Sequence, residues 1–332
     1  MSVKTGKDYG LSVARLIATL FIITCHIMQV EKMTLALWFN VGVQMFLYMS
    51  GYLYGRYRDI DPAGFMYARL KRLLIGFYVF SIPFSVILLA TKVYPIGWVD
   101  IVHFLTFSNF NFADGIGHLW FVPCIIVCYM MLTLLISILN KMDAIKSDAV
   151  YIAASIALML GVEFIFQLFI RNEMMKSPWI NCFVVGVVLR RISESDRRLK
   201  DYIGYVILFG CLVMNAAQIV MTYVLALEFE SYKLFLFDRI CDYAHMLLGI
   251  VLVEIIRRLF ANIGSDKVKS FLDTTDRLSY SVYLVHFVLI KGAFSLLKVI
   301  SPKALAVVAI YVSAILIGIL IDAITNMIQK RL

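Results

Sequence analysis

The chain has 332 residues, of which 62% are hydrophobic and only 16% are charged, against roughly 45–50% and about 25% in an ordinary soluble domain. A soluble fold would expose much of that apolar excess to water, whereas a lipid bilayer solvates it along the whole perimeter of a helix bundle. Composition therefore excludes an ordinary soluble protein and predicts one that crosses a membrane several times.

The net charge of +9 would suggest nucleic-acid binding in a soluble protein, but basic residues of membrane proteins collect in cytoplasmic loops. We therefore expect no nucleic-acid partner. The six cysteines all lie inside apolar runs, and the sequence has no C-x-x-C pair and no two histidines close together. We expect buried thiols and no metal site.

A membrane-spanning helix needs about 20 mostly apolar residues. Ten candidate runs follow one another, separated by charged or turn-rich breaks. They are residues 11–30, 35–55, 73–91, 118–139, 149–170, 178–190, 202–227, 239–256, 279–298 and 304–327.

Two of these runs have alternative interpretations. The first follows Lys4 and Lys7 as a signal peptide would, but Arg15 interrupts it and no small-residue cleavage site follows, so we expect a retained helix. The sixth, 178–190, is nearer the length of a re-entrant segment. We keep it as a span because its removal would place two large basic clusters outside.

Assigning the breaks alternately to two sides puts 21 of the 31 Lys and Arg residues on one side. The positive-inside rule makes that side cytoplasmic. We predict an all-α polytopic membrane helix bundle of about ten transmembrane helices with both termini cytoplasmic. It forms a single integral membrane domain over 1–332, without an appended soluble domain, in the cell (inner) membrane; the oligomeric state is not predicted.

Ionisable side chains at bilayer depth usually serve a site, and two of them share the first run. Arg15 and His26 are eleven residues apart. On a helix this spacing points the two side chains within roughly 20° of the same direction and separates them by about 16 Å along the axis. The alternatives are that Arg15 extends to the inner headgroups and that His26 makes an interhelical hydrogen bond. One helix face carrying both favours a site.

Other polar residues offer weaker signals. His118 precedes Trp120 at the start of the fourth run, where it could orient a substrate or anchor the helix at the interface. Tyr283 lies three residues before His286 and shares its helix face, although helix packing is the alternative. Glu163 is one of several acids that could orient His26.

Motifs for other chemistry do not occur. The sequence has no G-x-S-x-G nucleophile motif, no phosphate-binding glycine loop and no H-E-x-x-H, so hydrolase, NTPase and metalloprotease activities lose support. A ten-helix transporter or flippase that uses Arg15, His26 and Glu163 as a substrate or proton path remains the alternative to an enzyme. Transporters often show internal repeats and Gly/Pro-broken helices, and neither is evident here.

The run from Arg15 to His26 resembles the Arg-x10-His signature that opens the membrane-bound acyltransferase family 3, which includes bacterial polysaccharide and lipid-linked glycan O-acetyltransferases. Further similarities follow in order along most of the chain. They are Phe46–Tyr52, Arg69–Arg72, His118–Phe121, Phe183–Gly186 and Ser279–His286.

This resemblance implies an O-acyltransferase that moves an acetyl group, or another short acyl group such as succinyl, from cytosolic acetyl-CoA or another acyl-CoA to a hydroxyl of a cell-surface polysaccharide or lipid-linked glycan. His26 would be the general base, and Arg15 would bind or position the donor. Arg69 and Arg72 would bind the CoA phosphates. The predicted substrate-binding residues are His118, Trp120, Ser50, Tyr283, His286 and Glu163.

Overall fold

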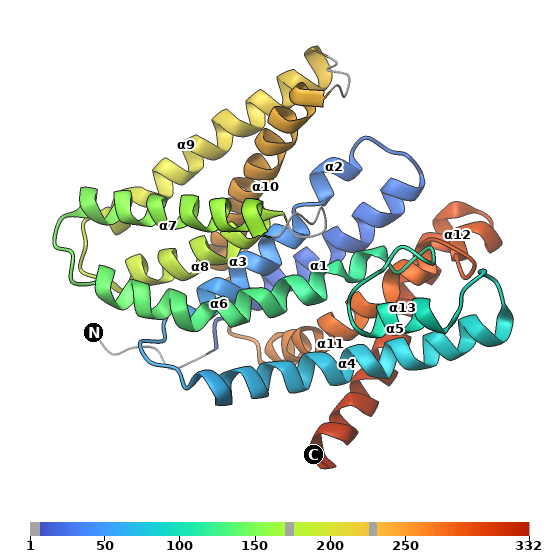
Figure 1. Ribbon diagram of the computed structural model, residues 1–332. Coiled ribbons are helices and arrows are strands. Elements are labelled where there is room, and N and C mark those ends of the chain that lie inside the picture. The colour runs from blue at the N-terminus through green and yellow to red at the C-terminus, as the bar shows by residue number, and fades with distance from the viewer. Residues whose placement is uncertain (1–6, 170–175, 226–230, 332) are drawn as a thin grey trace. The chain divides into compact units, whose positions relative to one another are not determined.

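The computed structural model describes residues 7–169, 176–225 and 231–331, with side chains from 236 onward in the last range. Within these ranges the regular structure is entirely helical, without a strand (Figure 1). Each of the ten predicted runs overlaps at least one helix, and residues 170 and 226–227, at the ends of two runs, lie outside the described ranges. The elements are α1 Tyr9–Val30, α2 Ala36–Phe39, α3 Gly42–Tyr54, α4 Pro62–Thr91, α5 Trp98–Leu105, η1 Gly117–Trp120, α6 Phe121–Met142, α7 Asp148–Phe169, α8 Ser177–Glu194, α9 Leu199–Ile219, η2 Val220–Val224, α10 Ser231–Leu259, α11 Asp266–Ile290, α12 Leu296–Val299 and α13 Lys303–Arg331.

Six helices of the described chain are long and apolar enough to cross a membrane: α1, α4, α6 extended by η1, α7, α9 extended by η2, and α13. The protein is therefore a multi-pass helical membrane protein. The count of ten spans and the cytoplasmic termini stay predictions.

Two predicted runs differ from the helices they fall on. The run 35–55 is divided between α2 and α3 at Asn40 and Val41, and the run 279–298 starts inside α11. The first turns of α11 carry charged residues that a search for apolar runs passes over, and α11 ends at Ile290 because Gly292 has a φ of +94°, which a right-handed helix does not accommodate.

The chain divides into two compact units, each described here by itself. Unit 1 contains residues 1–18, 38–60 and 131–269, and unit 2 contains residues 19–37, 61–130 and 270–332. The chain passes from one unit to the other within α1, α2, α6 and α11 as well as at residues 60–61.

In unit 1, α8 packs closely against α3 through glycines. A Cβ on Gly51 would overlap the carbonyl oxygen of Phe183, and a Cβ on Gly186 would overlap that of Tyr48. Gly51 and Gly55 form a G-x-x-x-G pair, and such small residues let membrane helices approach. Most of α8 is buried, and this enclosure by protein explains why its apolar run is short.

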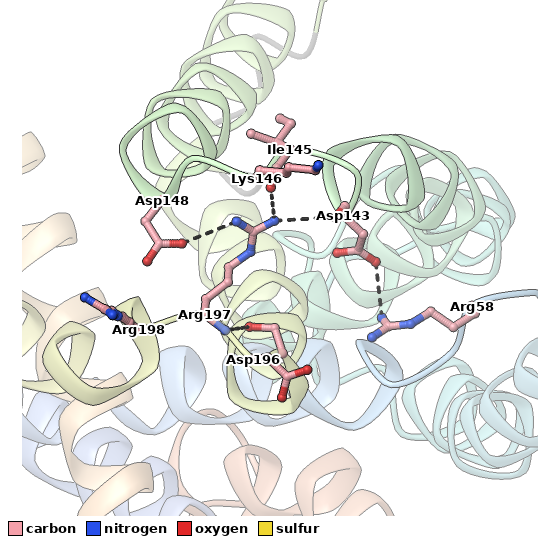
Figure 2. Close-up of a pocket in the computed structure, with 9 residues that line it drawn as sticks. Arg58, Asp143, Ile145, Lys146, Asp148, Asp196, Arg197 and Arg198 are labelled. Atoms are coloured by element: carbon pink, nitrogen blue, oxygen red, sulfur yellow. Dashed lines mark hydrogen bonds and ion pairs between the residues drawn. The ribbon is translucent and has the colours of Figure 1, made fainter.

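Arginines join the loops at one end of unit 1. The buried guanidinium of Arg191 donates to Asp143 Oδ2 at 2.7 Å and to the carbonyl of Tyr57 at 2.5 Å. Arg197 donates to the carbonyl of Ile145 at 2.5 Å and pairs with Asp148 at 3.4 Å. Figure 2 shows Arg197 reaching from its own loop to both partners, beside a pocket of about 660 Å³. We call Arg191, Arg197, Asp143 and Asp148 the arginine clasp.

In unit 2, α4 starts where the Asp61 carboxylate accepts hydrogen bonds from the backbone nitrogens of Ala63 and Gly64, which satisfies donors that have no partner within the helix. Pro62 at the first position suits that start. α11 and α13 approach each other at Gly318, where a Cβ would lie 2.8 Å from the Val282 side chain.

Candidate functional site

Three histidines from three separate segments of unit 2 lie together: His26 of α1, His118 of η1 and His286 of α11. The ring centroid of His118 is 4.8 Å from that of His286, and the centroid of His26 is 5.3 Å from His286 and 6.2 Å from His118. His286 is fully buried and His118 nearly so. We call these three residues the histidine cluster.

One backbone carbonyl orients two of the rings. The oxygen of Tyr283 lies 2.9 Å from His118 Nε2 and 2.7 Å from His286 Nδ1. Because a carbonyl only accepts hydrogen bonds, both of these nitrogens carry the proton and the other nitrogen of each neutral ring keeps its lone pair. His118 Nδ1 and His286 Nε2 are buried, with no hydrogen-bond partner among the described residues.

Tyr283 also holds the backbone around His118. Its hydroxyl donates to the carbonyl oxygen of His118 in a short hydrogen bond. Its ring lies edge-on to the His118 ring, with centroids 5.0 Å apart. Tyr283 therefore fixes the main chain and the imidazole of His118 together.

His26 has its own orienting partner. Its Nδ1 lies 2.9 Å from Oε1 of Gln29, one turn further along α1. An amide oxygen accepts only, so Nδ1 carries the proton and Nε2 keeps the lone pair. Phe287 stacks on the imidazole with centroids 4.2 Å apart. The ring is thus held on one face and at one edge, in the tautomer that leaves Nε2 basic.

Two glycine turns interlock beside the histidine cluster. Gly115 has a φ of +91°, and a Cβ there would lie 2.7 Å from the carbonyl oxygen of Lys291. Gly292 has a φ of +94°, and a Cβ there would lie 2.8 Å from the carbonyl oxygen of Asp114. Lys291 and Asp114 form an ion pair at 3.0 Å across the same contact. These turns set the distance between η1, which carries His118, and the end of α11, which carries His286.

Within the described ranges, no group of three or more His, Cys, Asp and Glu side chains has the geometry to hold a metal ion. In His118 and His286 the nitrogen that faces the backbone carbonyl carries the proton. The chemistry that this site supports is hydrogen bonding and proton transfer by imidazole.

The other predicted site residues of unit 2 are Trp120, Arg69 and Arg72. Trp120 is half-buried at the end of η1, with its ring 6.2 Å from that of Phe121. Arg69 is half-buried on α4, with its guanidinium 5.5 Å from the centre of the Phe65 ring, and Arg72 is exposed. Their predicted roles stay predictions.

Three predicted residues belong to unit 1. Arg15 is half-buried on α1, and Ser50 is half-buried on α3. Glu163 of α7 accepts hydrogen bonds at 2.9 Å from Arg239 and from Tyr243, both on α10. Its charge is balanced by Arg239, which is the arrangement of a carboxylate that joins helices.

Asp242 and His245 lie three residues apart on α10, and each side chain has a partner from another helix or loop. The Asp242 carboxylate pairs with Lys176 at 3.2 Å. His245 Nε2 lies 3.1 Å from the side-chain nitrogen of Gln218.

Sequence reasoning missed Gln29 and Phe287. Gln29 lies three residues after His26, a spacing that places the two side chains on one helix face, so this signal was present. Phe287 follows His286 directly, and nothing in the sequence indicates that it stacks on a ring of another helix.

Comparison with known families matches residues 8–323 to the Acyl_transf_3 family, described as an acyltransferase domain. The match covers nearly the whole chain. The chain belongs to acyltransferase family 3. Neither a curated protein nor a solved structure matched the chain.

Membership of acyltransferase family 3 makes the protein a membrane acyltransferase and favours the enzyme over the transporter alternative. It also confirms the family that the resemblance of the Arg15 to His26 run predicts. The family match does not by itself name the acyl donor or the acceptor, so these follow as a proposal.

Proposed function

We propose that this family 3 acyltransferase transfers an acetyl or other short acyl group from acyl-CoA to a hydroxyl of a surface polysaccharide or lipid-linked glycan, with His26 as the general base. The observation that carries the proposal is the orientation of His26. Gln29 holds its Nδ1 proton and Phe287 packs on its face, so Nε2 is the free, basic nitrogen.

In the proposed reaction His26 Nε2 first accepts one proton and then releases it. His26 Nε2 takes the proton of the acceptor hydroxyl while the oxygen attacks the thioester carbonyl carbon. The tetrahedral intermediate then collapses with cleavage of the carbon–sulfur bond. The CoA thiolate takes the proton from the imidazolium, which leaves an O-acyl ester, free CoA and a neutral His26.

The lone pairs of His118 Nδ1 and His286 Nε2 support an acceptor that brings hydroxyl groups. A buried lone pair without a partner costs free energy, and a hydroxyl donor removes that cost. Imidazole nitrogens oriented by one carbonyl would hold the acceptor beside His26. In this role His118 and His286 bind the acceptor, and His26 performs the proton transfer.

The donor side of the proposal rests on the basic residues that start α4. Guanidinium groups bind phosphate in a bidentate geometry, and Arg69 and Arg72 lie one turn apart there. With the termini in the cytoplasm, this end of α4 faces the compartment that contains acyl-CoA. Arg15 keeps its proposed role in positioning the donor.

The test compares His26→Ala with His103→Ala in proteoliposomes that receive acetyl-CoA and surface glycan from the host, with release of CoA as the measurement. General-base catalysis contributes about 10²–10⁴-fold, so we expect His26→Ala to lose at least about 100-fold of the glycan-dependent CoA release. His103 is an exposed histidine of α5, and its replacement should leave the rate unchanged. Undiminished O-acetyl transfer by His26→Ala at equal protein level would refute the role of His26.

A further inference from the structure

A second group of polar and aromatic side chains lies in unit 1, at the end of α9 and along α10. His245 of α10 is 2% exposed and Gln218 of α9 is fully buried. Ionisable side chains inside membrane helices mark functional sites by default, and the histidine cluster of unit 2 does not use this one. The loops of the arginine clasp lie at the other ends of α7, α8 and α9.

The side chains in this group contact one another in a continuous chain. The Gln218 side-chain nitrogen lies 3.1 Å from His245 Nε2. The His245 ring packs edge-on against the indole of Trp38, with centroids 6.0 Å apart. The indole nitrogen of Trp38 donates to the hydroxyl of Tyr223 at 3.3 Å. We call Trp38, Gln218, Tyr223 and His245 the α9–α10 site.

Buried polar atoms of Gln218 in the α9–α10 site, and of Thr222 in the π-helical turn that follows it, have hydrogen-bonding capacity to spare. Gln218 Oε1 and Thr222 Oγ1 are buried atoms without a hydrogen-bond partner within the described chain. Buried polar atoms of this kind are rare in native proteins and call for an explanation, of which a ligand is one. These two oxygen atoms therefore favour a ligand that donates hydrogen bonds.

The α9–α10 site also contains two aromatic side chains that are partly exposed. Tyr223 is 49% exposed and Trp38 is half-buried. Tyr223 belongs to the π-helical turn Val220–Val224, and such turns occur frequently at functional sites. Two partly exposed aromatic rings therefore form the accessible part of the α9–α10 site.

Charge and polarity narrow the class of ligand. A lipid chain has no donors for Gln218 Oε1 and Thr222 Oγ1. An anion would face oxygen lone pairs, and among the described side chains the Asp242 carboxylate is already paired with Lys176 at 3.2 Å, which disfavours a cation. A neutral ring that stacks on aromatic side chains and donates several hydroxyls meets every condition.

We infer that the α9–α10 site binds a sugar ring, and that this sugar belongs to the glycan acceptor. The second part rests on the proposed function, whereas the first part does not.

The experiment measures sugar binding without catalysis. Purified His26→Ala protein in phosphatidylcholine nanodiscs, which contain no sugar, is mixed with methyl glycosides of glucose, galactose, mannose, rhamnose and N-acetylglucosamine. Saturation-transfer NMR reports which glycoside protons contact the protein. We expect a signal from at least one glycoside, reduced at least fivefold when Trp38→Ala or Gln218→Leu is added.

Tyr205→Ala is the matched control, because Tyr205 is another exposed tyrosine of α9, at 74%, and its replacement should leave the signal unchanged. Gel filtration shows whether each variant is folded. Gln218→Leu removes the buried oxygen that has no hydrogen-bond partner within the described chain and replaces the side chain with an apolar one of similar size. It therefore tests binding even where Trp38→Ala fails to fold.

Two results would overturn the inference: the absence of a signal from all five glycosides, or a signal that the Gln218→Leu protein retains in full. Because the measurement uses His26→Ala, it is independent of acyl transfer. Sugar binding with no transfer activity in the unmutated protein would contradict only the proposed function. Transfer activity with no sugar binding here would contradict only the α9–α10 site.

Discussion

Single atoms decide what the histidine cluster can do. The three rings are chemically alike, yet they commit different nitrogens to their partners: Nδ1 in His26 and His286, and Nε2 in His118. The committed nitrogen fixes the tautomer and thereby the direction of the remaining lone pair. The imidazole of His26 is held by a side chain, whereas the other two accept their orientation from the backbone of α11, so the hydrogen bond that orients His26 can be removed by replacing its partner.

Replacing Gln29 tests this directly. Gln29→Leu removes the acceptor of the Nδ1 proton, so the His26 ring loses both its preferred tautomer and its orientation. We expect kcat for acyl transfer to fall about tenfold, a part of the 10²–10⁴-fold contribution of a general base, with little change in KM for acyl-CoA. Steady-state CoA release in proteoliposomes measures both parameters.

The conservative variant separates orientation from packing. Gln29→Glu keeps an acceptor oxygen at the same position and should restore most of kcat. Leu20→Ala, at a 42% exposed position of α1, serves as the control and should not change the rate. Equal kcat values for Gln29→Leu and the unmutated protein would show that Gln29 does not orient His26.

Elements bring the site together through close backbone contacts. η1 is placed by the interlocking turns at Gly115 and Gly292, and α8 is placed against α3 by Gly51 and Gly186. In both cases the contact depends on the absence of a Cβ. These glycines therefore control helix separation, and neighbouring glycines provide matched controls.

Gly115→Ala should displace η1. An L-residue at φ +91° costs roughly 1–2 kcal/mol, and the added Cβ would lie 2.7 Å from the Lys291 carbonyl oxygen. We expect a lower melting temperature and a loss of acyl transfer larger than the loss of folded protein, because His118 moves with η1. Gly117→Ala, where nothing lies within 4 Å of the new Cβ, should leave both unchanged. Similar effects of the two variants would contradict the role of the Gly115 turn.

Gly51→Ala should separate α3 from α8. Its Cβ would overlap the Phe183 carbonyl, and backbone cannot move aside as a flexible side chain can. Overpacking costs about 1–3 kcal/mol, so we expect reduced thermal stability of the solubilised protein. Gly161→Ala in α7 has open space around the Cβ and should be neutral or stabilise by about 0.5–1 kcal/mol. A Gly51→Ala protein with the same melting temperature as the unmutated protein would contradict close α3–α8 packing.

For the whole molecule, the sequence is informative wherever physical properties repeat along the chain. Apolar runs locate the helical segments of the described chain, and the Arg15 to His26 run predicts the family. The proximity of His26, His118 and His286 could not be derived from spacing, because it depends on three segments up to 260 residues apart. The partners of individual polar side chains could not be derived from the sequence either. Asp242 and His245 are three residues apart on one helix, yet they bind Lys176 and Gln218, respectively. Contacts within a helix follow from the sequence, and contacts between helices require packing.

The orientation in the membrane rests on charge alone and is the broadest prediction. Cysteine introduced at Lys146, an exposed residue beside the arginine clasp, should lie in the cytoplasm, and cysteine at Val99, 67% exposed on α5, should lie outside. The six native cysteines are free and buried, so they give little background. In intact cells a membrane-impermeant maleimide should label Val99→Cys and not Lys146→Cys, whereas permeabilised cells should show labelling of both. The opposite pattern would place Arg69 and Arg72 outside, away from cytosolic acyl-CoA, and would refute their proposed role in binding the donor.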